Sequence, residues 1–517
     1  MRVLSASVVL SSIVLGGWLT GAIAQSLGSD VRNALNPVQD EQAAEPGDVR
    51  VGVIPQPTVD APGTVMGITL GELYTDNLTM AAAGRPKQTS WITQIQPFIR
   101  WAGSSPRLAG LVDYEMTGYL YAGQSRHNQL AHNLTAQGRF TILPQHFFVD
   151  GTARYRREVI DSELSSGSGA FLLNNNQANV AMGTLSPYWI QDLGKVGTAM
   201  LRYTLGRVLY NDHGISGQNG DQLRGIPNIT SKAVQFSVAS PEDQIWGWNL
   251  GYSDQRIEPD FGRGIEYATA KLGLSWQIND STQLLADVGK ENQFLPDGTS
   301  RKLGASFWDV GFDWSNSRDH LKALVGHRFY GRSYQMSWGH TAALLTTVLS
   351  YTEQPTDLNQ QLLGQSLGQI ITSPTGISYI PSLRERQVYL MKRASASATY
   401  TMPRGKLRLS LYDERRTYFT LNNLHEKIAN ADLAWRFDIG PFTTLTPTVG
   451  WQRYQFRDGQ INHNRYVQVE LVHQINPNNF GSVQLRNDSR NVHAGITGAH
   501  DYRVNMILVQ WTHLFRD

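Results

Sequence analysis

The stretch 307–314 reads Phe-Trp-Asp-Val-Gly-Phe-Asp-Trp, and apolar side chains occupy every second position. Its even positions are Trp, Val, Phe and Trp, whereas Asp309 and Asp313 occupy odd positions. Because successive side chains of a β-strand point to opposite faces, this spacing predicts a strand with one apolar and one polar face.

The same alternation recurs from Val65 to the end of the chain. In the segment 405–411, leucines occupy every second position from 407 onward. Trp91 and Trp101 bound another such segment, and the tilted strand between them spans roughly 25 Å, the height of the apolar band of an outer-membrane barrel. A soluble β-sandwich also alternates, but here the pattern continues without a helical domain. The sequence therefore predicts an all-β fold, a single transmembrane antiparallel up-and-down β-barrel.

The composition agrees with this class and excludes others. Charged residues make up 17% of the 517 residues, below the roughly 25% of soluble domains. A formal net charge of +2 gives no basis for a nucleic-acid partner, which requires a concentrated basic face. The chain has no cysteine, which excludes disulfides, thiolate metal sites and cysteine nucleophiles.

The N-terminus has the pattern of an export signal. Arg2 precedes an apolar stretch from Val3 to Leu19, and Ala22-Ile23-Ala24 has the small-x-small form of a cleavage site. We expect residues 1–24 to be a cleaved signal peptide; the alternative is a single anchoring helix. Residues 25–63 are rich in Pro, Gln, Asp and Ala and predict a flexible periplasmic arm, too short for a plug domain.

Connection lengths give an independent criterion, since outer-membrane barrels alternate short periplasmic turns with longer surface loops. Short turns are expected at 103–106, 143–145, 192–195, 241–244, 279–280, 316–318, 341–342, 403–405, 440–441 and 476–478. Longer connections are expected between them at 77–90, 160–175, 211–228, 258–263, 292–302, 355–385 and 491–499. The surface connections after about residues 123, 330, 421 and 457 are shorter, so the alternation is imperfect.

The region 319–354 decides the strand count. Two strands there would break the alternation of short and long connections, whereas three strands (319–330, 332–340 and 343–354) preserve it. The barrel of residues 64–517 then has about 22 strands, with 20 to 24 as the range, an even number as expected for a bacterial single-chain barrel.

The C-terminal segment has the features of a last barrel strand. Alternate residues from Ile507 to Phe515 are mostly apolar, and aromatic Phe515 lies two residues from the end. We expect the barrel-assembly machinery and outer-membrane lipid as partners, and the outer membrane of a Gram-negative bacterium as the location.

The face opposite the apolar one is expected to line the lumen. Its charges have mixed signs, so they either pair across strands and hold the wall or form the polar surface that a hydrated solute follows. Mixed signs favour a large neutral or mildly charged glycan over a small ion. The candidate lumen residues are Asp113, Glu115, Arg154, Arg202, Lys271, Asp287, Asp309, Asp313, Arg328, Arg408, Glu414, Arg416, Asp432, Arg436, Glu470 and Arg486, and the candidate lipid-facing girdle residues are Trp91, Trp101, Trp308, Trp314, Trp511 and Phe515.

The long loop 355–385 is the best candidate for an obstruction of the lumen. Thr356 or Asp357 could cap a short helix, and Leu358, Leu362 and Leu363 begin a series of apolar residues at roughly helical spacing. The loop either enters the lumen or packs on the barrel rim as a surface loop.

Several short patterns resemble the outer-membrane β-barrel family that is associated with PEP-CTERM/exosortase systems and exopolysaccharide gene clusters. The resemblance implies an envelope protein in exopolysaccharide export, with exopolysaccharide and periplasmic secretion components as partners, and offers no catalytic residues. The resembling stretches are Tyr74-Thr75-Asp76-Asn77, Ile95-Gln96-Pro97, Asp113-Tyr114, Gly118-Tyr119, Phe329-Tyr330-Gly331-Arg332-Ser333-Tyr334, Ser350-Tyr351-Thr352-Glu353, Gln387-Val388-Tyr389-Leu390 and Lys392-Arg393.

Enzyme patterns are weak. Asp319-His320 and Asp413-Glu414 are the nearest to catalytic pairs, but in a barrel such residues more often serve as interface or lumen residues. We find no metal-ligand spacing and no phosphate-binding loop, and we expect no cofactor, no metal and no enzymatic activity. The leading hypothesis is a channel or scaffold in exopolysaccharide secretion. The alternatives are a general diffusion porin or nutrient-uptake channel and, third, an envelope enzyme active at the barrel rim.

Overall fold

The computed structural model describes residues 63–159, 171–173, 176–211, 226–241, 244–364, 387–420, 424–493 and 499–515. The expected signal peptide, the arm before Gly63 and most of the loop 355–385 lie outside these residues. Among the described residues, no helix has the length and apolar character needed to cross a membrane.

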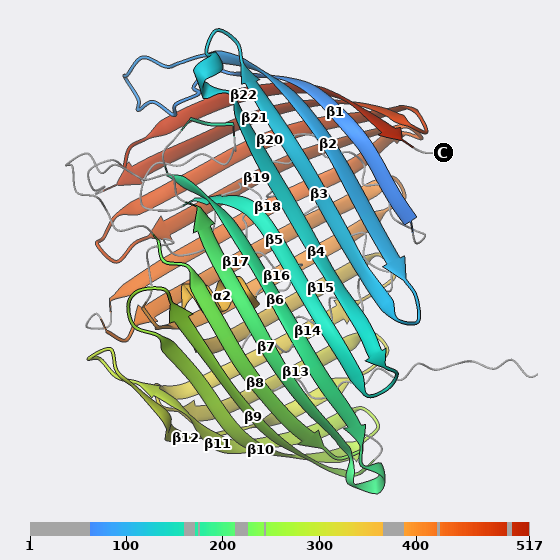
Figure 1. Cartoon of the computed structure of the whole chain (residues 1–517), viewed down its shortest axis with the longest axis vertical. Coiled ribbons are helices and arrows are strands. Elements are labelled where there is room, and N and C mark those ends of the chain that lie inside the picture. The colour runs from blue at the N-terminus through green and yellow to red at the C-terminus, as the bar shows by residue number, and fades with distance from the viewer. Residues whose placement is uncertain are drawn as a thin grey trace, which may run out of the picture.

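The described chain forms one sheet of 22 antiparallel strands, which confirms the predicted fold class and strand count. Each strand pairs with the next one in sequence, and Figure 1 shows the tilted strands wrapping into a barrel. The first half comprises β1 (Gly63–Thr75), β2 (Ser90–Ser104), β3 (Leu108–Tyr121), β4 (Gln129–Leu143), β5 (Phe147–Val159), β6 (Gln177–Asp192), β7 (Thr198–Asn211), β8 (Ile229–Ala239), β9 (Trp246–Pro259), β10 (Ile265–Asn279) and β11 (Thr282–Phe294).

The second half completes the wall and carries the one α-helix of the described residues, α2 (Leu358–Gly364). Two short 3₁₀ turns, Ser125–His127 and Gly194–Val196, lie in connections of the first half. The remaining strands are β12 (Ser300–Ser315), β13 (Asp319–Arg328), β14 (Gly331–Thr341), β15 (Leu345–Thr356), β16 (Tyr389–Met402), β17 (Gly405–Tyr418), β18 (His425–Gly440), β19 (Thr443–Gln455), β20 (Ile461–Asn476), β21 (Asn479–His493) and β22 (Tyr502–Phe515).

The last strand closes the barrel against the first. β22 pairs with β1 from Met66 opposite Phe515 to Thr75 opposite Met506. Because the barrel is closed, no strand has an unpaired edge. The backbone N–H and C=O groups of every strand therefore form hydrogen bonds with a neighbouring strand on both sides, as a lipid-exposed sheet requires.

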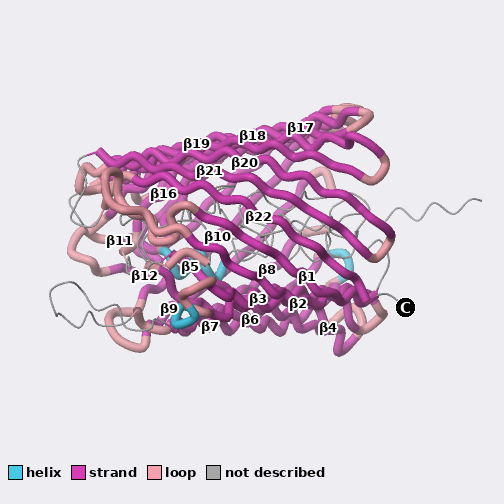
Figure 2. Tube along the Cα trace, turned by 90° about the horizontal axis from the view of Figure 1, so that it is seen from above, coloured by secondary structure: helices cyan, strands magenta, loops and turns pink. Residues whose placement is uncertain are grey.

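Short and longer connections alternate round most of the barrel, and the exterior connection 329–330 between β13 and β14 is an exception, as the sequence also indicates. The three strands β13, β14 and β15 fill the region 319–354. The connections that follow the even-numbered strands, from β2–β3 to β20–β21, are short. We assign the end with the short turns to the periplasm and the end with the longer loops to the exterior. Figure 2 shows the ring of strands from a second direction.

The two faces of the wall differ as the alternation predicts. Trp91, Trp308 and Phe515 point outward and are 57%, 47% and 54% exposed. Side chains at neighbouring positions point inward and bury polar groups against one another, as for Asp309, which is 7% exposed. An apolar outer face and a polar inner face are the arrangement of a barrel that stands in lipid and encloses water.

Candidate functional site: the lumen

Strand register places all sixteen candidate lumen residues on the inward face. For example, Asp287 lies opposite Asp309, and Asp313 lies opposite Lys322, so their side chains share one side of the sheet. The candidate girdle residues point outward. Trp91 and Trp308 lie toward the exterior edge of the apolar belt, and Trp101, Trp314, Trp511 and Phe515 toward its periplasmic edge.

Arg328 joins three neighbouring strands on the inner wall. Its two terminal nitrogens lie 2.6 Å from Oε2 of Glu291 and 2.6 Å from Oδ2 of Asp309. The Ser333 hydroxyl donates to Asp309 at 3.2 Å, and the guanidinium lies 4.4 Å from the centre of the Phe307 ring. One cation therefore neutralises two acids that would otherwise repel each other.

The same sector contains two looser pairs. Lys271 Nζ lies 3.9 Å from Asp287, and Lys322 Nζ lies 3.7 Å from Asp313. Each pair joins adjacent strands, so the cations of β10 and β13 flank the acids of β11 and β12 on the wall.

A second network forms round Asp150 on β5. Arg139 on β4 and Arg202 on β7 lie 2.8 Å and 3.1 Å from its carboxylate oxygens. The ring of Tyr188, on β6 between them, lies 4.1 Å from the Arg202 guanidinium carbon. The acid is 1% exposed, and two charge-assisted contacts compensate its burial.

The most buried network surrounds Arg416 on β17. Arg416 contacts Glu414 on the same strand and Glu426 on β18, and it donates to the Tyr454 hydroxyl at 2.8 Å. Arg393 on β16 lies 2.7 Å from Glu414. The Arg416 and Glu414 side chains are both 0% exposed, so this cluster depends on internal pairing alone.

Most of the remaining candidates are also paired or hydrogen-bonded. Arg100 lies 3.3 Å from Asp113, and Arg486 lies 2.8 Å from Asp488. Gln96 donates to Glu115 at 2.9 Å. Asp432 accepts a hydrogen bond from Asn430, Arg436 lies 3.7 Å from the exposed Asp438, and Arg154, Arg408 and Glu470 occupy inward positions on β5, β17 and β20.

The long loop begins with a capped helix. The Asp357 carboxylate accepts backbone N–H bonds from Asn359 at 3.2 Å and Gln360 at 3.1 Å, so Asp357 rather than Thr356 is the N-cap of α2. The Tyr267 hydroxyl on β10 also donates to it at 3.0 Å. Burial raises the pKa of the Asp357 carboxyl above its ordinary value.

α2, the described start of this loop, lies inside the barrel and not on its outer rim (Figure 1). Leu358 and Leu362 pack against inward side chains of β7 to β9, including Val208 and Ile257. Gly206 on β7 makes room for Leu363, because a Cβ there would lie 3.0 Å from the leucine Cδ2.

Hydrogen bonds tie the helix to two separate parts of the inner wall. Gln360 donates to Gln255 on β9, and Gln361 contacts the sulfur of Met391 on β16, both at 3.3 Å. α2 therefore crosses part of the interior from the end of β15 to a distant part of the wall.

Two further loops fold inward, and sequence analysis missed both. Leu78 and Met80, between β1 and β2, pack with Phe171 and Leu172, between β5 and β6, on the inner face of β22 to β3. Tyr121 donates a hydrogen bond to the Phe171 carbonyl oxygen at 2.5 Å. The apolar residues in these connections were the available signal. Together with α2 they narrow the exterior mouth from two sides.

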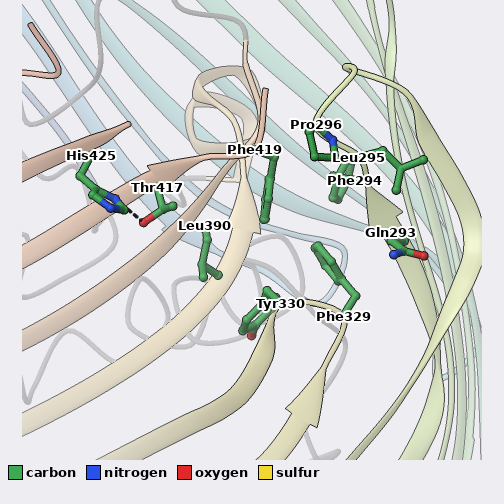
Figure 3. Close-up of a pocket in the computed structure, with 10 residues that line it drawn as sticks. All are labelled: Gln293, Phe294, Leu295, Pro296, Phe329, Tyr330, Leu390, Thr417, Phe419 and His425. Carbon is green, nitrogen blue, oxygen red and sulfur yellow. Dashed lines mark hydrogen bonds between the residues drawn. The ribbon is translucent and has the colours of Figure 1, made fainter. Parts of the chain in front are cut away.

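An aromatic pocket of about 460 Å³ lies at the exterior rim above the short strands β13 and β14 (Figure 3). Phe294 ends β11, whereas Phe329 and Phe419 lie in two separate connections, and the ring centres of Phe329 and Phe419 are 5.4 Å apart. Thr417 and His425 form a hydrogen bond of 3.0 Å at its edge. Sequence analysis did not bring these residues together.

Comparisons with known proteins support the fold alone. No protein-family model matches the chain, and no curated protein is similar to it. Among solved structures, the iron transporter FrpB of Neisseria meningitidis (F5-1 variant) superposes with a TM-score of 0.50 and 10% identity, over 88% of this chain and 83% of that chain. The siderophore receptor PirA from Acinetobacter baumannii has a TM-score of 0.45 and 8% identity, over 88% and 81%.

The protein is an outer-membrane β-barrel. A closed barrel with an apolar outer belt, aromatic residues at both edges of the belt and a polar interior fits no other compartment of the cell envelope.

This barrel separates both adjacent pairs that resembled catalytic dyads. Asp319 points outward, 2.7 Å from Nδ1 of His340, whereas His320 points inward and lies 3.7 Å from Asp313. Asp413 and Glu414 likewise lie on opposite faces of β17. In the described part of the chain, no group of three or more His, Asp or Glu side chains could hold a metal ion.

Proposed function

We propose that this outer-membrane barrel is a channel for a hydrated glycan and takes part in exopolysaccharide secretion. The observation that carries the proposal is the inner wall, where acids and bases pair with one another rather than form a ring of one sign. Such a wall holds no strong field along the axis and therefore selects poorly for small ions. It also presents many polar groups to a neutral or weakly charged polymer.

The rim pocket supports the same class of solute. Phe294, Phe329 and Phe419 offer flat apolar faces at the exterior mouth, against which sugar rings can pack. The short sequence patterns shared with barrels of exopolysaccharide gene clusters point in the same direction.

The proposal also defines partners. Outer-membrane lipid surrounds the wall, the barrel-assembly machinery inserts it, and periplasmic secretion components would meet the N-terminal arm, which lies outside the described residues. We propose no catalytic role and no cofactor.

A second candidate is a porin or uptake channel for a small solute. It is favoured by the exterior mouth, where α2 and the loops that carry Met80 and Phe171 leave less room than the strand number alone would give. The two candidates differ in the size of solute that enters.

Single-channel recording in a planar bilayer tests the proposal. We expect the refolded protein to conduct, and the exopolysaccharide of its own host to block the current reversibly. Dextran of equal size should not block it. Equal block by both polymers, or a current that neither polymer affects, would contradict a glycan-specific path and favour the small-solute channel.

A further inference from the structure

The outer surface of the barrel changes character along its height. On β18 the outward residues are Leu433, Trp435 and Phe437 in the periplasmic part, but His425 and Lys427 at the exterior end. The nearby strands β17, β19, β21 and β22 follow the same order, with apolar residues below and polar or charged residues in the top part of the outward face. The strands therefore extend beyond the hydrocarbon layer into the headgroup region of the outer leaflet.

In one sector this exterior part is strongly basic. Arg415 on β17 lies directly opposite Lys427 on β18, and both are exposed. Arg453 on β19 lies opposite His463 on β20, and Arg465 follows two residues later on β20. We refer to Arg415, Lys427, Arg453 and Arg465 as the basic face.

The basic face has no internal counter-charge among the residues that the structure describes. Arg415, Lys427 and Arg465 make no ion pair there. The nearest outward acid on β17, Asp413, forms no ion pair with Arg415. Like charges directly opposite each other on neighbouring strands destabilise a sheet, so this sector is built to meet an external anion.

The other side of the barrel shows the contrast. There several outward cations at the same end are paired with acids, as in Lys232 with Glu258 at 3.3 Å and Arg256 with Glu266 at 2.9 Å. Arg207 likewise lies 3.2 Å from Asp260. Among the described residues, other exposed outward cations without an ion pair at this end, Lys290, Arg332 and Arg503, lie on separate strands. What distinguishes β17 to β20 is that such cations lie directly beside one another on neighbouring strands.

We propose that the basic face binds the phosphate groups of lipopolysaccharide in the outer leaflet. Trp451, the outward residue below Arg453, marks the edge of the apolar belt, and aromatic residues concentrate at that interface. The basic face thus stands just above the acyl chains, where the phosphates of the lipid lie. Arginine and lysine are the side chains that bind phosphate best.

The occupant is a membrane lipid rather than a soluble polyanion, because the basic face continues directly from the lipid-covered belt on the same strands. The lumen faces the other side of the wall, so this inference does not depend on the proposed channel function.

Binding of purified lipid A to the detergent-solubilised, full-length protein tests the proposal by native mass spectrometry. We expect bis-phosphorylated lipid A to bind and dephosphorylated lipid A to bind roughly tenfold or more weakly. The variant R415Q/K427Q/R465Q should lose the preference for the phosphorylated form. The control K232Q/R256Q, which alters paired cations at the same level, should keep it.

Two results would overturn the proposal. One is equal binding of both forms of lipid A by the unaltered protein, which requires no variant and so does not depend on folding of the mutants. The other is unchanged binding by the triple variant, with heat-modifiable migration showing that the barrel is folded. The charge-conserving variant R415K/K427R should bind as the unaltered protein does.

Discussion

Deletion of residues 358–380 should raise the single-channel conductance of the refolded barrel several-fold. The described part of this segment, α2, occupies part of the lumen and contacts the wall at Gly206 and at Met391. Because a barrel of this strand number encloses a wide interior, material that crosses it limits the current. Planar-bilayer recording of the deletion variant beside the full chain gives the measurement.

A substitution tests the same constriction without shortening the chain. Gly206→Leu fills the space taken by Leu363. The substitution should displace α2 and so raise the single-channel conductance. Gly339→Leu is the matched control, because Gly339 also faces the lumen but has nothing within 4 Å of an added Cβ. Unchanged conductance in the deletion and in Gly206→Leu would exclude α2 as the constriction.

Arg416→Met should lower the free energy of unfolding by about 3–5 kcal/mol, since removing one partner leaves buried charges uncompensated. Arg416 contacts Glu414, Glu426 and Tyr454 and is fully buried. Urea unfolding in lipid vesicles, followed by tryptophan fluorescence, measures the change.

Arg436→Met is the control for this prediction. Arg436 is 46% exposed and lies 3.7 Å from Asp438, so its loss should cost no more than about 1 kcal/mol. Similar losses for Arg416→Met and Arg436→Met would mean that the buried network contributes no more than a surface pair.

The barrel wall could be predicted because the two faces of each strand appear in the sequence as an alternation of polar and apolar residues. The alternation round Asp309 and Asp313 assigned both faces, and the parity of the connections required three strands in 319–354, as observed. A polar residue that alternates with apolar neighbours along a strand points to the face opposite the apolar one. Its inward or outward position therefore follows from the sequence alone.

The partners of these residues were not predictable. Asp150 binds Arg139 and Arg202 from strands on either side, and that choice depends on register and strand stagger, which alternation does not specify. Asp319 and His320 are adjacent in the sequence, but their side chains lie on opposite faces of the sheet, because neighbouring residues on a strand point in opposite directions.

The packing of the loops could not be predicted from the sequence pattern either. The helical spacing after Asp357 indicated a short helix but not whether it enters the lumen, since the same leucines could cover the rim. The inward position follows from sites far away in the sequence, such as Gly206 and Val208. The aromatic pocket likewise assembles from strand ends and connections that are far apart in the sequence and that no local pattern relates.

Cysteine labelling tests most directly whether the inner wall encloses water. The chain has no cysteine, so single replacements report without background. Ser397 on β16 faces the lumen opposite Val348, which is 46% exposed, and Ala398 faces outward. In reconstituted vesicles, Ser397→Cys should react with membrane-impermeant thiol reagents of either charge, and Ala398→Cys should react with neither. A protected Ser397→Cys, or reaction with reagents of only one charge, would contradict a water-filled and charge-balanced lumen.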